Sequence, residues 1–176
     1  AISEVANTLV AQFRKLRISV KFDDRTTQKP GFKFAEWELK GVPLRVAIGA
    51  RDMQNGTVEL ARRDTQTKET VEQAGLANRI HALLDEIQDN IYQKALNFRD
   101  SHITEVNSYD EFKTLLEEKG GFLSCHWDGT VETEKRVKEE TKATIRCIPL
   151  DNKLEDGVCI YSGKPSIQRV LFARAY

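Results

Sequence analysis

With 176 residues, of which 40% are apolar and 31% charged, the chain has the composition of a folded globular protein and not of a disordered segment. Its formal net charge is zero, so overall charge predicts no nucleic-acid binding, and any such binding must come from a local pattern. No apolar run approaches the roughly 20 residues of a membrane span, so we expect no membrane partner, and the scattered Cys125, Cys147 and Cys159 indicate reduced thiols in the cytoplasm.

The first half of the chain is predicted to alternate helices with strands. Apolar residues recur at three- and four-residue steps from Ile2 to Leu16, which predicts a helix. Apolar and polar residues then alternate over 18–22, which predicts a half-buried strand. A short helix at 31–40 ends at a Gly-Val-Pro break, and strands are expected at 44–48, 57–63 and 69–71, with turns at 53–56 and 64–67. A helix that leads into such a series predicts an α/β layer.

The second half is predicted to hold a long helix and a small α+β domain. Apolar residues keep helical spacing from Leu76 to Phe98, as one long helix or two. Ser108 and Glu111 are spaced as a capping box that begins another helix. The remaining elements are expected as strands at 122–125, 144–148 and 170–175 and a helix at 130–142.

The stretch 23–52 places two Phe and a Trp among six Lys or Arg and five Asp or Glu. Aromatic faces beside cations and carboxylates suit unstacked nucleic-acid bases, which need a π-face to lie on and polar partners for their edges. The alternative is an amphipathic helix that buries Phe34, Trp37 and Leu39 in a core while its charges are only solvated. Composition alone leaves both interpretations open.

Specific motifs in this stretch resemble a known family. The sequence PGFKFAEWELKGVPLRVAIGARD, followed by GTVELARRDT, resembles the anticodon-binding domain of class II prolyl-tRNA synthetases of the archaeal/eukaryote-like form. The chain end, GKPSIQRVLFARAY, is similar to the end of the same form, as are the blocks DNIYQKALNFRDSHI, YDEFKTLLEEKGGF and ETKATIRCIPL between them. The resemblance therefore covers nearly the whole chain.

The resemblance implies an α/β fold in two domains. Residues 1–103 are expected to form a truncated anticodon-binding domain, a mixed sheet flanked by helices, with its closing helix. The family's domain opens with a strand ahead of the first helix, and we expect that strand to be missing here. Residues 104–176 are expected to form a small α+β domain that resembles the family's zinc-binding C-terminal domain.

The resemblance also implies the activity of a parent protein. That protein would be a cytoplasmic proline–tRNA ligase, a homodimer that uses ATP and Mg²⁺ to attach proline to its tRNA. The N-terminal catalytic domain would lie before Ala1, since the chain itself shows no Gly-rich phosphate loop or equivalent. We therefore expect no catalytic residue here, and a chain that holds the anticodon of proline tRNA.

Proline anticodons end in two guanines, and the family reads them with residues of the opening stretch. A guanine offers neighbouring N–H donors on its Watson–Crick edge, which a carboxylate accepts, and O6 and N7 acceptors, which suit Arg or Lys. Carried over by motif, the anticodon-binding residues are Phe34 as a stacking platform, Glu38, Arg45, Asp52 and Lys68. Secondary contacts to the tRNA backbone are expected from Lys33, Lys40 and Arg51, and also from Asp24 and Arg25.

Many family members hold a structural zinc in the second domain with a C-x4-C pair and a later C-x2-C pair. Those four positions correspond here to Asp128, Thr133, Cys159 and Ser162. Structural zinc requires four Cys or His ligands, so we expect no zinc at this site and expect buried free cysteines instead. Cys125 and His126 are neighbours on a predicted strand, so their side chains point to opposite faces and cannot form a nucleophile–base pair.

The last residue and the function each leave alternatives open. Tyr176 resembles a family terminus that contacts the absent catalytic domain, or it is an aromatic residue that finishes the last strand. Two other functions compete with anticodon recognition: a protein-interaction module that keeps the fold without binding tRNA, and the anticodon domain of a different class II synthetase. The ELKGVP block and the terminal Tyr argue against the latter.

Overall fold

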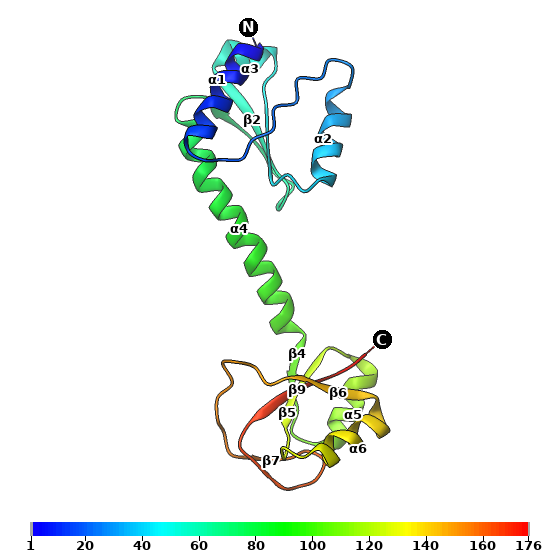
Figure 1. Ribbon diagram of the computed structural model, residues 1–176. Coiled ribbons are helices and arrows are strands. Elements are labelled where there is room, and N and C mark those ends of the chain that lie inside the picture. The colour runs from blue at the N-terminus through cyan, green and yellow to red at the C-terminus, as the bar shows by residue number, and fades with distance from the viewer. Residues whose placement is uncertain (1, 176) are drawn as a thin grey trace. The chain divides into compact units, whose positions relative to one another are not determined.

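The computed structural model describes residues 2–175, which form two compact units, unit 1 (Ala1–Lys94) and unit 2 (Ala95–Tyr176) (Figure 1). The division after Lys94 falls within one continuous helix, α4 (Leu76–Ser101). The predicted domain boundary after residue 103 stays a prediction, since it divides the chain by family resemblance and not by compactness.

Unit 1 contains a three-stranded antiparallel sheet with the strand order β1-β2-β3. The elements that precede α4 are α1 (Ile2–Lys15), α2 (Pro30–Leu39), β1 (Leu44–Ala47), α3 (Ala50–Asn55), β2 (Thr57–Arg62) and β3 (Lys68–Glu72). Consecutive strands joined by short connections pair antiparallel, because a parallel pair needs a longer crossover. The α/β class is confirmed, but the mixed sheet lies in unit 2.

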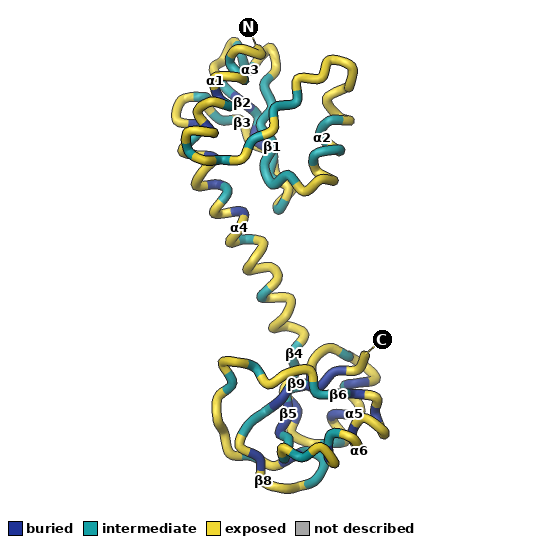
Figure 2. The backbone as a smooth tube through the Cα atoms, in the orientation of Figure 1, coloured by how far each residue is buried: buried dark blue, intermediate teal, exposed yellow. Residues whose placement is uncertain are grey.

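The core of unit 1 lies on one face of this sheet. Val58 and Leu60 of β2 are buried there, against apolar residues from two helices. These are Leu9 and Phe13 of α1 and Leu76, Ile80, Leu83 and Ile87 of α4. Helix α2 contributes no buried residue (Figure 2).

Two predictions about unit 1 were wrong. Residues 18–22 alternate between half-buried and exposed, as expected, but they form no strand, since none of the described strands pairs with them. Residues 53–56, predicted as a turn, end the short helix α3. That helix closes with Gly56 in the left-handed conformation at φ 68°, which favours glycine. The helix at 31–40, the strands of the sheet and the long helix, which is one element and not two, are confirmed.

Unit 2 is built on a four-stranded mixed sheet with the order β4-β5-β9-β6 and a separate two-stranded ladder, β7-β8. Its elements are β4 (Ile103–Glu105), α5 (Tyr109–Glu118), β5 (Phe122–His126), α6 (Val131–Thr141), β6 (Ala143–Cys147), β7 (Gly157–Val158), β8 (Pro165–Ser166) and β9 (Arg169–Arg174). Strands β4 and β5 are parallel and α5 connects them. Phe112 and Phe172 meet edge to face in the core.

The predicted helix starts in unit 2 are confirmed. Ser108 caps α5, because its hydroxyl accepts a hydrogen bond from the backbone N–H of Glu111, and Thr130 caps α6 in the same way. The short strands β4, β7 and β8 were not predicted, since two or three residues carry too little alternation to be recognised. Within residues 2–175, no helix combines the length and the apolar character needed to cross a bilayer.

Gly157 generates a test of the packing in unit 2. A Cβ at this position would lie 2.1 Å from Nε2 of the buried His126, so Gly157→Ala forces the imidazole or β7 to move. We expect a loss of about 1–3 kcal/mol in the free energy of unfolding, as for other overpacked sites, measured by urea unfolding. Gly31→Ala is the control, because a Cβ on Gly31 meets nothing within 4 Å. Equal stability of both variants would contradict this packing.

Candidate nucleic-acid interface

The sheet of unit 1 has an open face opposite its core. Because side chains alternate along a strand, burial of Val58 and Leu60 places the residues between them on the other side. The strand register then sets one row of neighbours across this face: Arg45 of β1 pairs with Ala61 of β2, which pairs with Lys68 of β3. Two of the predicted anticodon-binding residues therefore flank one small side chain.

Helix α2 stands on this open face, on the side of the sheet away from α1 (Figure 1). The guanidinium carbon of Arg45 lies 3.6 Å from the centre of the Phe34 ring. Phe34 and Trp37 are half-buried, and Leu39 is 90% exposed. The alternative of a helix that buries Phe34, Trp37 and Leu39 in a core is therefore wrong, because the open face is polar and leaves the apolar end of the helix in solvent.

Arg45 is the centre of the polar contacts on this face. Its Nη1 lies 3.6 Å from Oε1 of Glu38, and its Nη2 donates a hydrogen bond of 3.1 Å to Oε1 of Glu59. Its Nε is buried and has no hydrogen-bond partner among the described residues. A shallow groove beside it is lined by Phe34, Trp37, Glu38, Val42, Arg45, Ala61 and Arg63. Phe34, Glu38 and Arg45 are thus brought together, and Glu59, for which no role was predicted, joins them.

Asp52 has a structural role, at the start of α3, that its motif did not indicate. It lies in the first turn of α3, where its carboxylate accepts hydrogen bonds from the backbone N–H of Gly49 (2.8 Å) and from the hydroxyl of Thr57 (3.1 Å). Thr57 lies on the open face, four residues or roughly 13 Å along β2 from Ala61. Asp52 is therefore near the other end of the open face from Arg45, and does not contact it.

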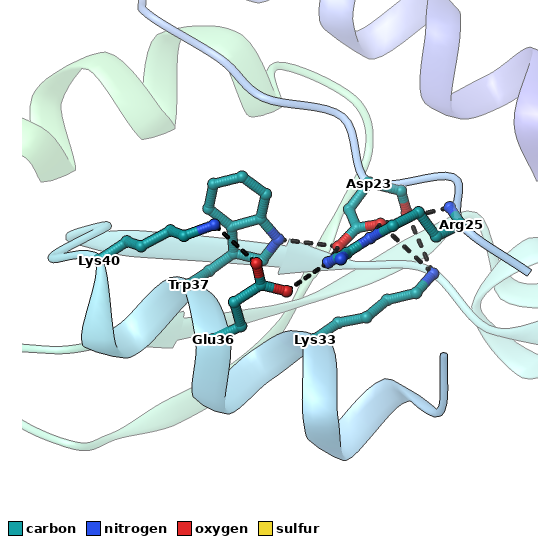
Figure 3. Close-up of polar contacts among 6 residues, drawn as sticks. All are labelled: Asp23, Arg25, Lys33, Glu36, Trp37 and Lys40. Atoms are coloured by element: carbon teal, nitrogen blue, oxygen red, sulfur yellow. Dashed lines mark hydrogen bonds and ion pairs between the residues drawn. The ribbon is translucent and has the colours of Figure 1, made fainter. Parts of the chain in front are cut away.

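The cations of unit 1 divide into paired and unpaired groups. Lys33 and Lys40, two of the predicted secondary contacts, bond to Asp23 and Glu36 inside unit 1, and Arg25 joins the same network (Figure 3). By contrast, the side chains of Arg51, Arg63 and Lys68 are exposed and have no ion-pair partner within residues 2–175. Arg63 lines the groove and lies within the motif GTVELARRDT, but no role was predicted for it.

In unit 2, the four positions that correspond to zinc ligands of the family lie together. Oδ2 of Asp128 accepts hydrogen bonds from the hydroxyls of Thr133 (2.8 Å) and Ser162 (2.7 Å), and the backbone N–H of Ser162 approaches Sγ of Cys159 at 3.5 Å. Oδ1 accepts from the backbone N–H and the hydroxyl of Thr130. Burial alone would raise the pKa of Asp128, but the hydrogen bonds from Ser162, Thr133 and Thr130 lower it to about 2.

This cluster contains only two groups that bind zinc well, the carboxylate of Asp128 and the thiol of Cys159. No group of three or more His, Cys, Asp or Glu that suits a metal occurs in the described part of the chain. Cys125 and Cys159 are buried, as predicted, whereas Cys147 is exposed at the end of β6, where the prediction of a buried thiol was wrong. Tyr176 lies outside the described residues.

Comparison with known proteins assigns both halves of the chain. Residues 1–83 match the family of the anticodon binding domain, and residues 109–176 match the family of the prolyl-tRNA synthetase C-terminal domain. Over 175 residues, 99% of its length, the chain is 62% identical to proline–tRNA ligase of Flavobacterium psychrophilum and 58% identical to that of Porphyromonas gingivalis. It spans only 36% and 35% of these two relatives.

A solved structure agrees with these matches. The chain superposes with a TM-score of 0.92, at 30% identity, on the crystal structure of prolyl-tRNA synthetase from Cryptosporidium parvum complexed with L-proline and AMP, covering 99% of this chain and 37% of that one. These matches define the class of protein, an anticodon-binding module of an aminoacyl-tRNA synthetase. Within that class, the chain belongs to the prolyl-tRNA synthetase family and corresponds to the C-terminal part of its members.

The Asp128 cluster predicts a stability effect with a defined pH dependence. Asp128→Asn removes the acceptor of two hydroxyl donors, so we expect a loss of about 1–3 kcal/mol in the free energy of unfolding near neutral pH. Because the folded pKa of about 2 lies below the unfolded value of about 3.9, the contribution of the charge is complete above that value and is lost as the pH falls toward 2.

The measurement is urea unfolding of both proteins from about pH 7 down to the lowest pH at which they fold. The stability difference should narrow as the pH falls through the range of these two pKa values. Asp151→Asn, an exposed carboxylate in the following loop, is the control and should change stability little. A difference that is absent, or constant with pH, would contradict the role of the charge.

Proposed function

We propose that this chain holds the anticodon of proline tRNA for a proline–tRNA ligase, and that its open face reads the two guanines of that anticodon. The observation that supports this most directly is the placement of the Arg45 guanidinium, stacked on Phe34 and directed at two carboxylates. The site thus brings an aromatic ring, a cation and two carboxylates together, and these are the partners that a guanine base requires.

The chemistry of guanine matches each part of this arrangement. Its N1–H and N2–H₂ form a donor edge that Glu38 or Glu59 can accept, and its ring system can stack on Phe34. Its O6 and N7 are acceptors that suit the guanidinium of Arg45. Lys68 lies in the same row of the open face as Arg45 and could serve a second guanine, whereas Asp52 lies toward the other end of this face. Adenine lacks the donor pair that the carboxylates require.

Phosphate contacts would come from the cations without partners. Arg51, Arg63 and Lys68 are exposed, so each can approach a phosphate without first breaking an ion pair. Lys33 and Lys40 would contribute less, because they already neutralise Asp23 and Glu36. Such contacts fix the position of the RNA and make its binding depend on salt, but they carry no sequence information.

The chemical step would belong to the rest of the protein. In the proposed ligase, a catalytic domain outside this chain uses ATP and Mg²⁺, works as a homodimer in the cytoplasm, and receives the tRNA that this module selects. Unit 2 would fold without zinc, its loops held by Asp128 where relatives of the resembled form use thiolates. A protein-interaction module without RNA binding is the competing function, and the following measurement separates the two.

The first test is the affinity of the chain for proline tRNA and for the same tRNA with both anticodon guanines replaced by adenine. We expect the binding free energy to weaken by about 1–3 kcal/mol for each guanine replaced, because each replacement leaves a carboxylate without hydrogen-bond donors. Phe34→Ala should weaken binding by about 1–3 kcal/mol through lost stacking, and Glu38→Gln should reduce the preference for guanine. Binding is measured by fluorescence anisotropy at several salt concentrations.

Phe32→Ala is the matched control, because Phe32 lies on the same helix, is 57% exposed and has no ring or cation contact among the described residues. It should leave the affinity unchanged. Lys68→Ala should weaken the binding of both tRNAs and reduce the salt dependence of that binding. A lysine that contacts phosphate has a smaller effect on the discrimination between the two tRNAs. Equal affinity for both tRNAs would contradict guanine recognition, and no salt-dependent binding at all would favour the protein-interaction module.

Elemental analysis tests the proposed absence of zinc. We expect less than one zinc per ten chains in protein purified without chelator, since four suitable ligands are required and the cluster offers two. Addition of EDTA should leave the thermal unfolding unchanged. One zinc per chain, lost together with stability on EDTA treatment, would contradict the assignment of the Asp128 cluster as a metal-free site.

A further inference from the structure

We infer that Asp23 and Arg25 are positioning residues: they hold helix α2, and through it Phe34 and Glu38, over the open face of unit 1. This inference rests on the proposed function, because it explains how the base-reading side chains are kept in place. It concerns residues that do not themselves line the groove beside Arg45.

Helix α2 has little apolar anchorage of its own. None of its residues is buried, and its two outermost apolar side chains, Phe32 and Leu39, are 57% and 90% exposed. A helix of ten residues is not stable in isolation and normally depends on the packing of an apolar face. Other contacts must therefore fix the position of α2 against the sheet.

Those contacts come from the segment that precedes the helix. The carboxylate of Asp23 accepts hydrogen bonds from Nε1 of Trp37 (2.8 Å) and from Nη2 and Nε of Arg25 (2.6 and 2.9 Å). Nζ of Lys33 donates to the carbonyl oxygen of Asp23 at 3.3 Å. The side chain of Asp23 is only 12% exposed, and the bonds from Arg25 first and Trp37 second keep its pKa well below the usual range.

Arg25 extends the contact to a second point on the helix. Its Nη2 also donates to Oε2 of Glu36 at 2.6 Å, and Oε1 of Glu36 accepts from Nζ of Lys40 at 2.6 Å. The ammonium group of Lys40 lies 4.6 Å from the centre of the Trp37 ring. The chain of contacts is therefore closed: it runs from Asp23 through Arg25, Glu36, Lys40 and Trp37 back to Asp23 (Figure 3).

The closed network contacts one face of α2 and leaves the face with Phe34 and Glu38 free. Lys33, Glu36, Trp37 and Lys40 are spaced three and four residues apart, so they share one face of the helix. Phe34 and Glu38 are four residues apart on the neighbouring face, where they meet Arg45. A rotation or displacement of α2 that broke the network would move Phe34 and Glu38 away from Arg45 and from the place of a bound base.

The test compares Asp23→Asn with Asp24→Asn. Both substitutions remove one negative charge from neighbouring positions, but only Asp23 bonds to Arg25 and Trp37, whereas Asp24 is exposed and has no partner within residues 2–175. We expect Asp23→Asn to weaken binding of proline tRNA by about tenfold or more, as for the loss of a charged hydrogen-bond partner. Asp24→Asn, which removes no contact to α2, should leave amide exchange within 30–39 unchanged.

A double-mutant cycle distinguishes positioning from direct contact. In the Phe34→Ala, Glu38→Ala background, Asp23→Asn should have almost no further effect, because it acts through those two side chains. The same tenfold loss in that background would show that Asp23 acts elsewhere and would overturn the inference. Arg25→Lys, which keeps the charge and one hydrogen bond, should restore part of the affinity that Arg25→Ala loses.

Two readouts without RNA keep the inference separate from the proposed function. Amide hydrogen exchange within 30–39 should become faster in Asp23→Asn while exchange within β2 stays the same, because α2 is outside the core. In a Trp127→Phe background, the emission of Trp37 should also shift. Unchanged exchange and emission would overturn the inference whatever the RNA binding. If the unsubstituted protein showed no preference for guanine, the proposed function would be overturned but the inference about the position of α2 would not.

Discussion

Burial of one face of the β1–β3 sheet against α1 and α4 is the constraint on which the rest of unit 1 depends. Val58 and Leu60 cannot leave the core without a large cost, of about 1.5–3 kcal/mol for each side chain. Their burial fixes the strand register, and the register in turn fixes Arg45, Ala61 and Lys68 as one row on the open face. A slip of one residue would send these charges into the core. The apolar pattern therefore also directs the polar residues that the proposed function uses.

In unit 2, polar contacts connect segments outside the sheet. The Asp128 carboxylate joins the segment before α6 to the turn at 159–162, through Thr133 and Ser162. It also accepts two hydrogen bonds from Thr130, the residue that caps α6. A single ionised acceptor with four donors can thus connect the same segments as a tetrahedral metal. Its stabilisation depends on the ionised carboxylate, whereas that of a zinc site depends on metal supply.

The sequence predicted the strands of four or more residues that form ladders and every helix except the six-residue α3, since the longer elements carry enough periodicity to be recognised. The strand predicted at 18–22 was wrong: the alternation of burial was correct, but a local pattern cannot show whether a neighbouring strand is available for pairing. The family resemblance named Phe34, Glu38 and Arg45 as anticodon-binding residues, but it did not predict the contacts of Arg45 with the other two, which depend on the placement of α2. Glu59 lies within the motif GTVELARRDT, but no role was predicted for it, because its contact with Arg45 crosses from β2 to β1 and depends on the strand pairing. Asp128 and Ser162 were noted as lost ligands, but their mutual hydrogen bonds depend on tertiary structure.

The attachment of α2 by polar groups suits the proposed role of this helix, which is to present aromatic side chains to bases. If Phe34 and Trp37 were packed in a core, as in an ordinary amphipathic helix, no ring would be accessible for stacking. Holding the helix through Asp23, Arg25 and Glu36 leaves its aromatic faces near the surface. Exposed ion pairs are individually weak, about 0–1 kcal/mol, so a lone pair would not fix a helix. A closed set of shared acceptors around a carboxylate that is only 12% exposed is better suited, because each bond restrains the partners of the next.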